Sequence, residues 1–357
     1  MTPQLINIDE IQDSSEFSEV IDVRSPSEFA EDHLPGAVNL PVLSNEERAK
    51  VGDLYHNQSK FAARRHGASL VSRNISEMLA GHLSEKPGDY HPLIYCWRGG
   101  QRSNSLATIL AAIGWRVGLL EGGYKSYRSW VVRRLEEGFG SPDLRLVILA
   151  GLTGSGKTQM LHQMQERGVQ VLDLEALAIH RGSILGNEPG IPQPHQKRFE
   201  SRLVEAVQSY DLSRPVFVES ESHRVGDLYV PGALWKAMKA SAVIELKVDL
   251  DERVRFLRDD YQHFQNDQER LIQCLDVLRR LQGNEKVERW IALIQAGNWD
   301  ELIRSLLVEH YDSAYVSSRS KFAGGTFGQV HLESLSEEGI EAGLEQVLDL
   351  SSGLAMK

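Results

Sequence analysis

Residues 144–158 read LRLVILAGLTGSGKT, and this stretch decides the fold of the second half of the chain. Residues 144–150 are almost wholly apolar, which predicts a buried strand. Residues 151–158 match the pattern G-x-x-x-x-G-K-[ST], in which glycines let successive backbone N–H groups turn toward a phosphate chain. A helix is expected to begin directly afterwards, and its dipole adds to the attraction for an anion. The stretch therefore predicts a site for a diphosphate or triphosphate group.

The loop offers candidate ligands for the phosphates at Gly151, Gly154, Ser155, Gly156, Lys157 and Thr158. Lys157 would neutralise the terminal phosphate, and Thr158 is also the candidate ligand of Mg²⁺. A second acid is expected at the end of a later strand. Asp173 follows the apolar run 169–172 and Glu219 follows 215–218, so both are candidates, and either could instead be a surface acid at a strand end.

Apolar runs of strand length occur on both sides of a short segment rich in glycine, serine and proline. These runs are 20–23, 93–96 and 117–120 before that segment, and 144–150, 169–172, 215–219 and 242–246 after it. Helical patterns separate them, so each half is predicted to be an α/β layer with a largely parallel sheet. The predicted organisation is a first domain at 1–137, a linker at 138–143, and a second domain at 144–357 with a helical extension from about residue 251.

Composition restricts the classes of protein that fit. A hydrophobic content of 41% and a charged content of 25% are ordinary for a soluble globular protein. No apolar run approaches the ~18 residues of a membrane span, and the first residues lack the features of a secretory signal. The two cysteines, Cys96 and Cys274, lie far apart, which argues against a disulfide framework or a zinc site. A cytoplasmic location without membrane association is expected.

Cys96 ends a buried strand and opens the loop CWRGGQRS, residues 96–103, before a helix. A thiol there would lie among backbone amides and near the positive end of the helix, while Arg98 and Arg102 add positive charge. These features favour the thiolate and an anion beside it. Cys96, Arg98 and Arg102 are the candidate catalytic residues. Cys274 falls in a stripe of leucines at helical spacing, which is typical of a buried structural cysteine.

The segments IDVRSPSEF at 21–29 and HLPGAVNLP at 33–41, together with the cysteine loop, resemble a rhodanese domain, the fold that carries sulfur as a cysteine persulfide. Asp32 stands where a glycine commonly precedes the histidine. Five residues separate Cys96 from Arg102, a longer spacing than in many single-domain rhodaneses. This spacing is similar to that of rhodanese-like dual-specificity phosphatases, whose loop holds a tetrahedral phosphate. The loop therefore suits selenophosphate, and a Cys-dependent phosphatase remains an alternative.

A rhodanese-like domain followed by a P-loop NTPase-like α/β domain resembles the tRNA 2-selenouridine synthases. Local support comes from EERAKVG at 46–52, YCWRGG at 95–100, LEGGYK at 120–125 and HRGS at 180–183. The resemblance implies that wobble 2-thiouridine in tRNA is alkylated on sulfur by geranyl diphosphate, and that selenium from selenophosphate then displaces the geranylthiol. It implies Cys96 as the selenium carrier, tRNA as partner and substrate, and no tightly bound cofactor. The enzyme that produces selenophosphate is a further candidate partner.

A net charge of −11 opposes RNA binding, so a tRNA enzyme with this sequence needs a local basic surface. The segment YKSYRSWVVRR at 124–134 offers one, with its aromatic residues available to stack on bases and its cations Lys125, Arg128, Arg133 and Arg134 as candidates for tRNA binding. The same pattern also fits an amphipathic helix with solvated arginines. A sulfurtransferase fused to an ATP-dependent small-molecule kinase is a further alternative for the whole chain.

Overall fold

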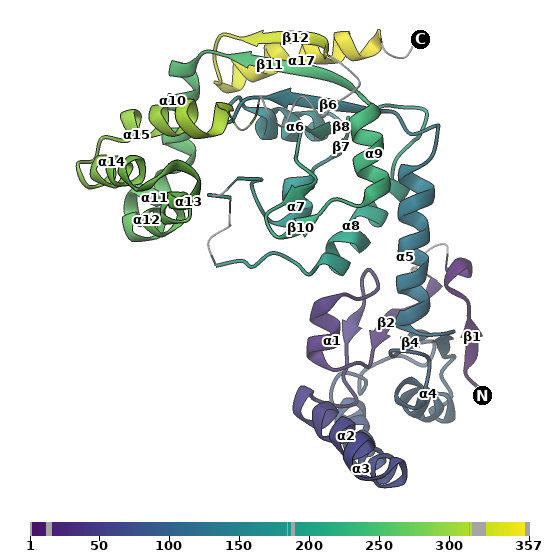
Figure 1. Ribbon diagram of the computed structural model, residues 1–357. Helices are drawn as coiled ribbons and strands as arrows, with labels where there is room; N and C mark the ends of the chain where they lie inside the picture. The colour runs from purple at the N-terminus through teal and green to yellow at the C-terminus, as the bar shows by residue number, and fades with distance from the viewer. Residues whose placement is uncertain are drawn as a thin grey trace. The chain divides into compact units, whose positions relative to one another are not determined.

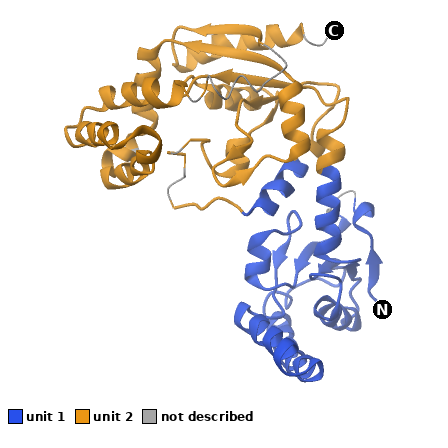
Figure 2. Ribbon diagram, in the orientation of Figure 1, with its two compact units in different colours: residues 1–134, 195–205 blue, residues 135–194, 206–357 orange. Residues whose placement is uncertain are grey.

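The computed structural model describes residues 2–11, 16–183, 185–186, 190–313, 315 and 326–353. The chain divides into two compact units, residues 1–134 with 195–205, and residues 135–194 with 206–357 (Figure 2). Helices α5 (Tyr124–Phe139) and α8 (Gln196–Gln208) each contain residues of both units. The segment expected as a linker therefore begins inside α5, and residues 195–205 join the first unit although sequence placed them in the second domain.

The first unit contains five parallel strands in the order β1-β5-β4-β2-β3 (Figure 1). The strands are β1 (Gln4–Ile6), β2 (Glu19–Asp22), β3 (Val38–Asn39), β4 (Pro92–Tyr95) and β5 (Gly118–Leu120). The helices are η1 (Ile8–Glu10), α1 (Pro26–Glu31), α2 (Asn45–Asn57), α3 (Lys60–Ala80), α4 (Gln101–Ile113) and part of α5. The predicted parallel α/β layer is confirmed, and the core lies between the sheet and helices α3 and α4.

Local sequence explains how helix α1 begins. Pro26 occupies the first turn, where its missing N–H costs nothing, and the Glu28 carboxylate accepts a hydrogen bond from Ser25 N at 3.1 Å. The segment 21–29 thus places a strand end, a tight connection and a helix start in succession. This arrangement brings Glu28 to the same edge of the sheet as the loop after β4.

The second unit contains five parallel strands in the order β12-β11-β6-β8-β7 (Figure 1). The strands are β6 (Leu146–Gly151), β7 (Gln170–Leu172), β8 (Val216–Glu219), β11 (Ala242–Val248) and β12 (Thr326–Leu332), with a separate antiparallel pair β9 (Arg224–Val225) and β10 (Leu228–Tyr229). Helices α6 (Lys157–Glu166), α7 (Leu174–Ala178), α9 (Gly232–Ala240) and α17 (Glu337–Ser352) accompany the sheet. The predicted α/β fold of this unit is also confirmed.

The helical extension has a core of its own. It comprises α10 (Leu250–Asp260), α11 (Gln262–Asn266), α12 (Gln268–Asp276), α13 (Arg279–Gln282), α14 (Asn284–Gln295), α15 (Trp299–Leu306) and the π-helical turn η3 (Leu307–Tyr311). Phe264, Leu275 and Trp290 are among the side chains buried there. Cys274 is half-buried on α12, and burial raises the pKa of its thiol. None of the described helices is both long enough and apolar enough to cross a membrane.

Candidate functional site

Cys96 directly follows β4, and its side chain is buried. Its Sγ accepts hydrogen bonds from Gly100 N at 3.3 Å and from Ser103 Oγ at 3.2 Å. Gly100 caps the N-terminus of α4, so the sulfur lies at the positive end of that helix. The pair of donors and the helix end would stabilise an anionic sulfur. Ser103 was not predicted as a site residue, because a serine in the first turn of a helix has no distinctive local pattern.

The turn at residues 121–124 supports the cysteine loop from behind. Gly123 has a backbone φ of +61°, and a Cβ there would lie 2.3 Å from Cys96 O and 2.6 Å from Gly99 N. Directly after it, Tyr124 N donates to Cys96 O at 2.8 Å and Lys125 N to Trp97 O at 3.0 Å. The loop and the turn can approach this closely only because the residue between them has no side chain.

The two candidate arginines of the loop have different surroundings. Arg98 is exposed. Arg102 donates to both carboxylate oxygens of Glu28, at 2.6 and 3.2 Å. Burial acts to raise the pKa of Glu28, but the hydrogen bond and charge of Arg102 lower it. Arg102 is thus held by an acid at the loop edge, and its catalytic role, like that of Arg98, stays a prediction.

Asp32 has a structural partner in the segment that joins the first unit. Its Oδ2 accepts hydrogen bonds from Tyr124 Oη and from Ser201 Oγ, both at 3.0 Å. The carboxyl group is buried, and burial raises its pKa. Next to it, Arg198 Nη1 donates to His33 O at 3.2 Å. The aspartate in place of the usual glycine therefore fastens residues 195–205 to the first unit.

The phosphate-binding loop lies between β6 and α6, as its sequence predicts. Gly154 and Gly156 have φ values of +78° and +76°, a conformation that glycine adopts without strain. Lys157 Nζ donates to Gly151 O at 2.9 Å and to Leu152 O at 3.3 Å. Burial lowers the pKa of Lys157, whereas nearby carboxylates act to raise it. All six residues predicted from this loop to bind phosphate line the same pocket.

Five acids line the same pocket as this loop, namely Asp173, Glu175, Glu219, Glu221 and Asp260. Glu175 N donates to Glu219 Oε1 at 3.0 Å, and Thr158 Oγ1 donates to Glu175 Oε2 at 3.3 Å. Asp173 instead caps α7, accepting from Ala176 N at 2.8 Å. Asp173 and Glu219 were predicted from the sequence, whereas Glu175, Glu221 and Asp260 were not. The polar run after β8 was the available signal for Glu221.

Thr158 is the residue of this loop that could bind Mg²⁺ through its side chain. The described residues contain no group of three His, Cys, Asp or Glu side chains arranged to hold a metal ion. Mg²⁺ is commonly bound through one or two protein oxygens together with substrate phosphates, and the Thr158 hydroxyl beside the Glu175 carboxylate provides such oxygens. Thr158 and Glu175 are therefore the residues that would hold Mg²⁺ with a bound diphosphate, Glu175 as the carboxylate after loss of its proton.

Burial raises the pKa of Glu175 to about 8, and the charge of Glu221 adds to the effect. Burial also raises the pKa of Glu219 and of Glu221. These acids keep protons to a higher pH than exposed carboxyls do, which limits the repulsion that a bound diphosphate would meet.

We expect Glu175→Gln to raise the melting temperature at pH 9 and to change it little at pH 5. The pKa of Glu175 is 4.5 in the unfolded chain and about 8 in the folded protein. At pH values between these two, the folded protein holds a proton that the unfolded chain has lost, so the stability of the wild type falls as the pH rises. Glutamine does not titrate, so the variant does not lose stability in this way. Calorimetry at pH 5, 7 and 9 tests this, with the exposed Glu166→Gln as control. An equal shift at all three values would contradict it.

Comparison with known proteins extends these observations. A family model described as the AAA domain of tRNA 2-selenouridine synthase matches residues 144–334, more than half of the chain. The chain belongs to the tRNA 2-selenouridine synthase family. A rhodanese-like domain model matches residues 7–129.

Curated relatives named tRNA 2-selenouridine synthase agree with this membership. The Nitrosomonas europaea protein is 38% identical over 246 residues, which are 68% of this chain and 63% of the relative. The Bdellovibrio bacteriovorus protein is 38% identical over 68% of this chain and 64% of the relative. The Shewanella halifaxensis protein is 32% identical over 83% of this chain and 87% of the relative. The matches thus span just under two thirds of the length of the first two relatives.

In this member of the tRNA 2-selenouridine synthase family, the candidate tRNA-binding cations lie on α5 and differ in their surroundings. Lys125 is exposed. Arg128 pairs with Glu200, and Arg133 pairs with Asp9. The guanidinium of Arg134 lies 5.5 Å from the centre of the Trp130 ring. Two of the aromatic side chains, Tyr124 and Tyr127, are buried, so they pack in the core rather than stack on bases.

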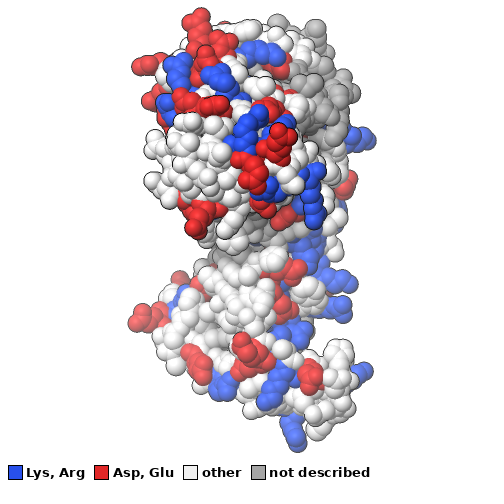
Figure 3. All heavy atoms as spheres, turned by 60° about the vertical axis from the view of Figure 1, so that its left-hand side comes forward, with Lys and Arg blue, Asp and Glu red and all other residues white. Residues whose placement is uncertain are grey.

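The helical extension of this family member mixes the two signs of charge. In the view of Figure 3, Lys and Arg side chains lie among Asp and Glu side chains over the second unit. Arg258 lies 3.2 Å from Asp300, Arg279 lies 2.6 Å from Asp276, and Arg253 lies 2.6 Å from Asp312. Such pairing leaves these arginines partly neutralised and less suited to a phosphate backbone.

Proposed function

We propose that this chain is a selenotransferase that converts wobble 2-thiouridine of tRNA into 2-selenouridine. The observation that carries the proposal is the presence of two different anion sites on one chain, a thiol held by Gly100 N and Ser103 Oγ and a phosphate-binding loop around Lys157. Membership of the tRNA 2-selenouridine synthase family supports it. A cytoplasmic location and an association with the enzyme that makes selenophosphate remain predictions from sequence.

The proposed first step takes place at the phosphate-binding loop. The sulfur of 2-thiouridine attacks the first carbon of the geranyl group, and the carbon–oxygen bond to the diphosphate breaks. The diphosphate leaves with the electron pair of that bond, so negative charge grows on the group that the loop amides and Lys157 would hold.

The proposed second step uses the rhodanese-like unit. Alkylation turns a poor leaving group into a good one, because the geranylthiolate can depart with its electron pair once a selenium nucleophile has added to the base. Cys96 is proposed to attack the phosphorus of selenophosphate, so that the P–Se bond breaks and selenium leaves as selenide with the electron pair. The selenide then adds to the alkylated base, and water hydrolyses the S-phosphocysteine to free Cys96 and phosphate. Support comes from the donors to Cys96 Sγ and from the end of α4, which together favour an anion at this position.

One assay tests the proposal as a whole. The protein is incubated with tRNA carrying 2-thiouridine, geranyl diphosphate and selenophosphate, and the nucleosides are analysed by mass spectrometry. We expect an S-geranylated nucleoside first and 2-selenouridine later. A requirement for ATP, or phosphorylation of a small molecule without tRNA, would favour the sulfurtransferase–kinase alternative instead.

For tRNA binding, we expect that Lys125→Ala/Arg128→Ala and Arg133→Ala/Arg134→Ala both weaken the complex. For every phosphate that a variant no longer neutralises, the slope of log affinity against log salt should fall by about 0.7–0.9. A salt titration measures this, and Arg64→Ala/Arg65→Ala on α3 removes equal charge from exposed positions as a control. If neither α5 variant changes affinity or slope, α5 is an amphipathic helix without a role in tRNA binding.

A further inference from the structure

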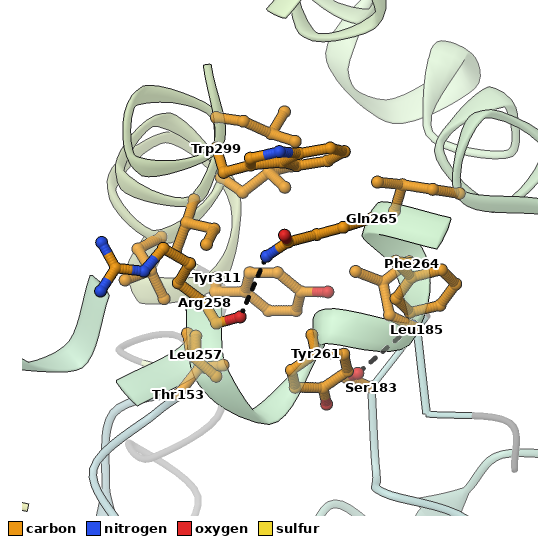
Figure 4. A pocket seen from close by; sticks show the side chains of 15 residues that line it. Thr153, Ser183, Leu185, Leu257, Arg258, Tyr261, Phe264, Gln265, Trp299 and Tyr311 are labelled. Carbon is orange, nitrogen blue, oxygen red and sulfur yellow. Dashed lines mark hydrogen bonds between the residues drawn. The ribbon is translucent and has the colours of Figure 1, made fainter. Parts of the chain in front are cut away.

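An apolar pocket lies in the second unit among α10, α11, α15 and η3 (Figure 4). Aromatic and aliphatic side chains form most of its wall, including Leu257, Tyr261, Phe264, Trp299, Leu302 and Tyr311. Nothing in the two-step reaction described so far assigns a role to this pocket. An apolar pocket of this kind on a ligand-binding domain typically receives a small molecule.

Two of the polar side chains at its wall already have partners. Gln265 Nε2 donates to Arg258 O at 3.3 Å, and Ser183 Oγ accepts from Leu185 N at 3.2 Å (Figure 4). A purine placed here would bury ring nitrogens and an amino group that need hydrogen bonds of their own, which costs free energy if they are not made. A hydrocarbon needs none. The lining thus favours a hydrocarbon over a nucleobase.

The pocket adjoins the phosphate-binding loop. Thr153, Leu257 and Tyr261 line both pockets, and the Leu257 side chain packs against Gly154. Arg253 Nε donates to Thr153 O at 2.9 Å, which fastens α10 to the loop. A group bound to the loop through a diphosphate therefore begins its chain next to the apolar wall.

Trp299 lies on the other side of the pocket. It lines the apolar pocket but not the phosphate pocket, and Figure 4 shows it across the space from Thr153 and Ser183. Its ring is half-buried at the start of α15. A chain that starts at Thr153 and extends through the pocket would reach Trp299 last.

We propose that this pocket binds the apolar chain of the diphosphate ester whose diphosphate binds the loop, and that Trp299 limits the length of that chain. This inference rests on the proposed function, which supplies a ten-carbon prenyl diphosphate as the alkyl donor. It adds the residues that hold the chain, all of them in the helical extension and the loop beside it. The helical extension is thereby part of the geranyl-transfer site.

The test compares the binding of geranyl diphosphate and inorganic diphosphate to the full-length protein by calorimetry. Each buried methylene contributes about fourfold in affinity, so the wild type should prefer geranyl diphosphate by at least about 50-fold. Ile303→Trp fills the pocket from α15 and should reduce the preference to about fivefold or less, while inorganic diphosphate binds as before. Val308→Trp adds the same ring at a position that is 51% exposed and should change neither affinity.

A second variant tests the length limit. Trp299→Ala should raise the affinity for farnesyl diphosphate relative to geranyl diphosphate by about tenfold, because removal of the indole gives room for further methylenes. An unchanged ratio in a folded Trp299→Ala protein would overturn the length limit. Retained preference for geranyl diphosphate in folded Ile303→Trp would overturn the pocket assignment.

Different results would contradict the proposed function and the assignment of the apolar pocket. If the wild type binds neither inorganic diphosphate nor geranyl diphosphate, the proposed function fails, and the chain pocket fails with it. If the wild type transfers geranyl groups to tRNA and Ile303→Trp does so equally well, only the pocket assignment is wrong. Loss of ATP binding alone in Ile303→Trp would identify the occupant as a nucleobase and overturn the inference.

Discussion

The Cys96→Ala variant is expected to accumulate S-geranylated nucleoside in tRNA and to form almost no 2-selenouridine. Removal of the nucleophile should slow selenium incorporation by at least about 1,000-fold. The alkylation step should continue, because the phosphate-binding loop belongs to the second compact unit and Cys96 to the first. Alanine also leaves Gly100 N and Ser103 Oγ without their sulfur acceptor, so the anion site itself is weakened.

Mass spectrometry of tRNA nucleosides from cells that express the variant measures both products at once. Cys274→Ala is the matched control, since it removes the second thiol from a half-buried position on α12. It should leave both products at wild-type levels. Normal formation of 2-selenouridine by Cys96→Ala would contradict a role of Cys96 in selenium delivery. Loss of both products would mean that the two steps are not separable.

The Lys157→Ala variant should show the reverse pattern, with a defect in geranyl transfer. Removal of one cation from a site built to receive developing negative charge costs about 2–4 kcal/mol, roughly 30- to 1,000-fold in rate. The Nζ atom donates to Gly151 O and Leu152 O, so it lies within the loop where the leaving diphosphate would bind. The Cys96 site lies in the other unit and should react normally with tRNA that is already geranylated.

Single-turnover geranylation of 2-thiouridine-containing tRNA measures the effect. Lys236→Ala removes an exposed ammonium group from α9 of the same unit and should be neutral. If Lys157→Ala geranylates tRNA at the normal rate, the loop serves another ligand. ATP is then the leading candidate, and the sulfurtransferase–kinase alternative gains support.

Much of the architecture follows from local sequence, because short apolar runs and glycine loops act at short range. The runs at 20–23, 93–96 and 144–150 form β2, β4 and β6 to within a residue or two. Strand β12 was not predicted. Its partner β11 lies about eighty residues earlier, and the pairing of Leu246 with Val330 is fixed by the shared core rather than by the strand's own pattern.

The site residues divide in the same way, into those that local sequence predicts and those that depend on the folded structure. The motif residues Cys96 and Lys157 were identified because their loops have distinctive local patterns. Ser103, Glu175 and Glu221 were not, since their importance comes from distances across the fold, such as 3.2 Å from Ser103 Oγ to Cys96 Sγ. The apolar pocket beside the loop could not be foreseen either. Its lining comes from separate helices that each present an ordinary apolar stripe.

The hydrogen bond between Asp32 and Ser201 affects how the protein is made. When the ribosome has added residue 137, all five strands of the first sheet exist, but the helix that carries Ser201 does not. Until that helix exists, Asp32 has only its Tyr124 donor, and the surface that residues 195–205 cover in the finished protein is open to water. The first unit can complete its packing only after residue 205 has emerged. A recombinant fragment that stops at residue 137 should accordingly be prone to proteolysis and aggregation.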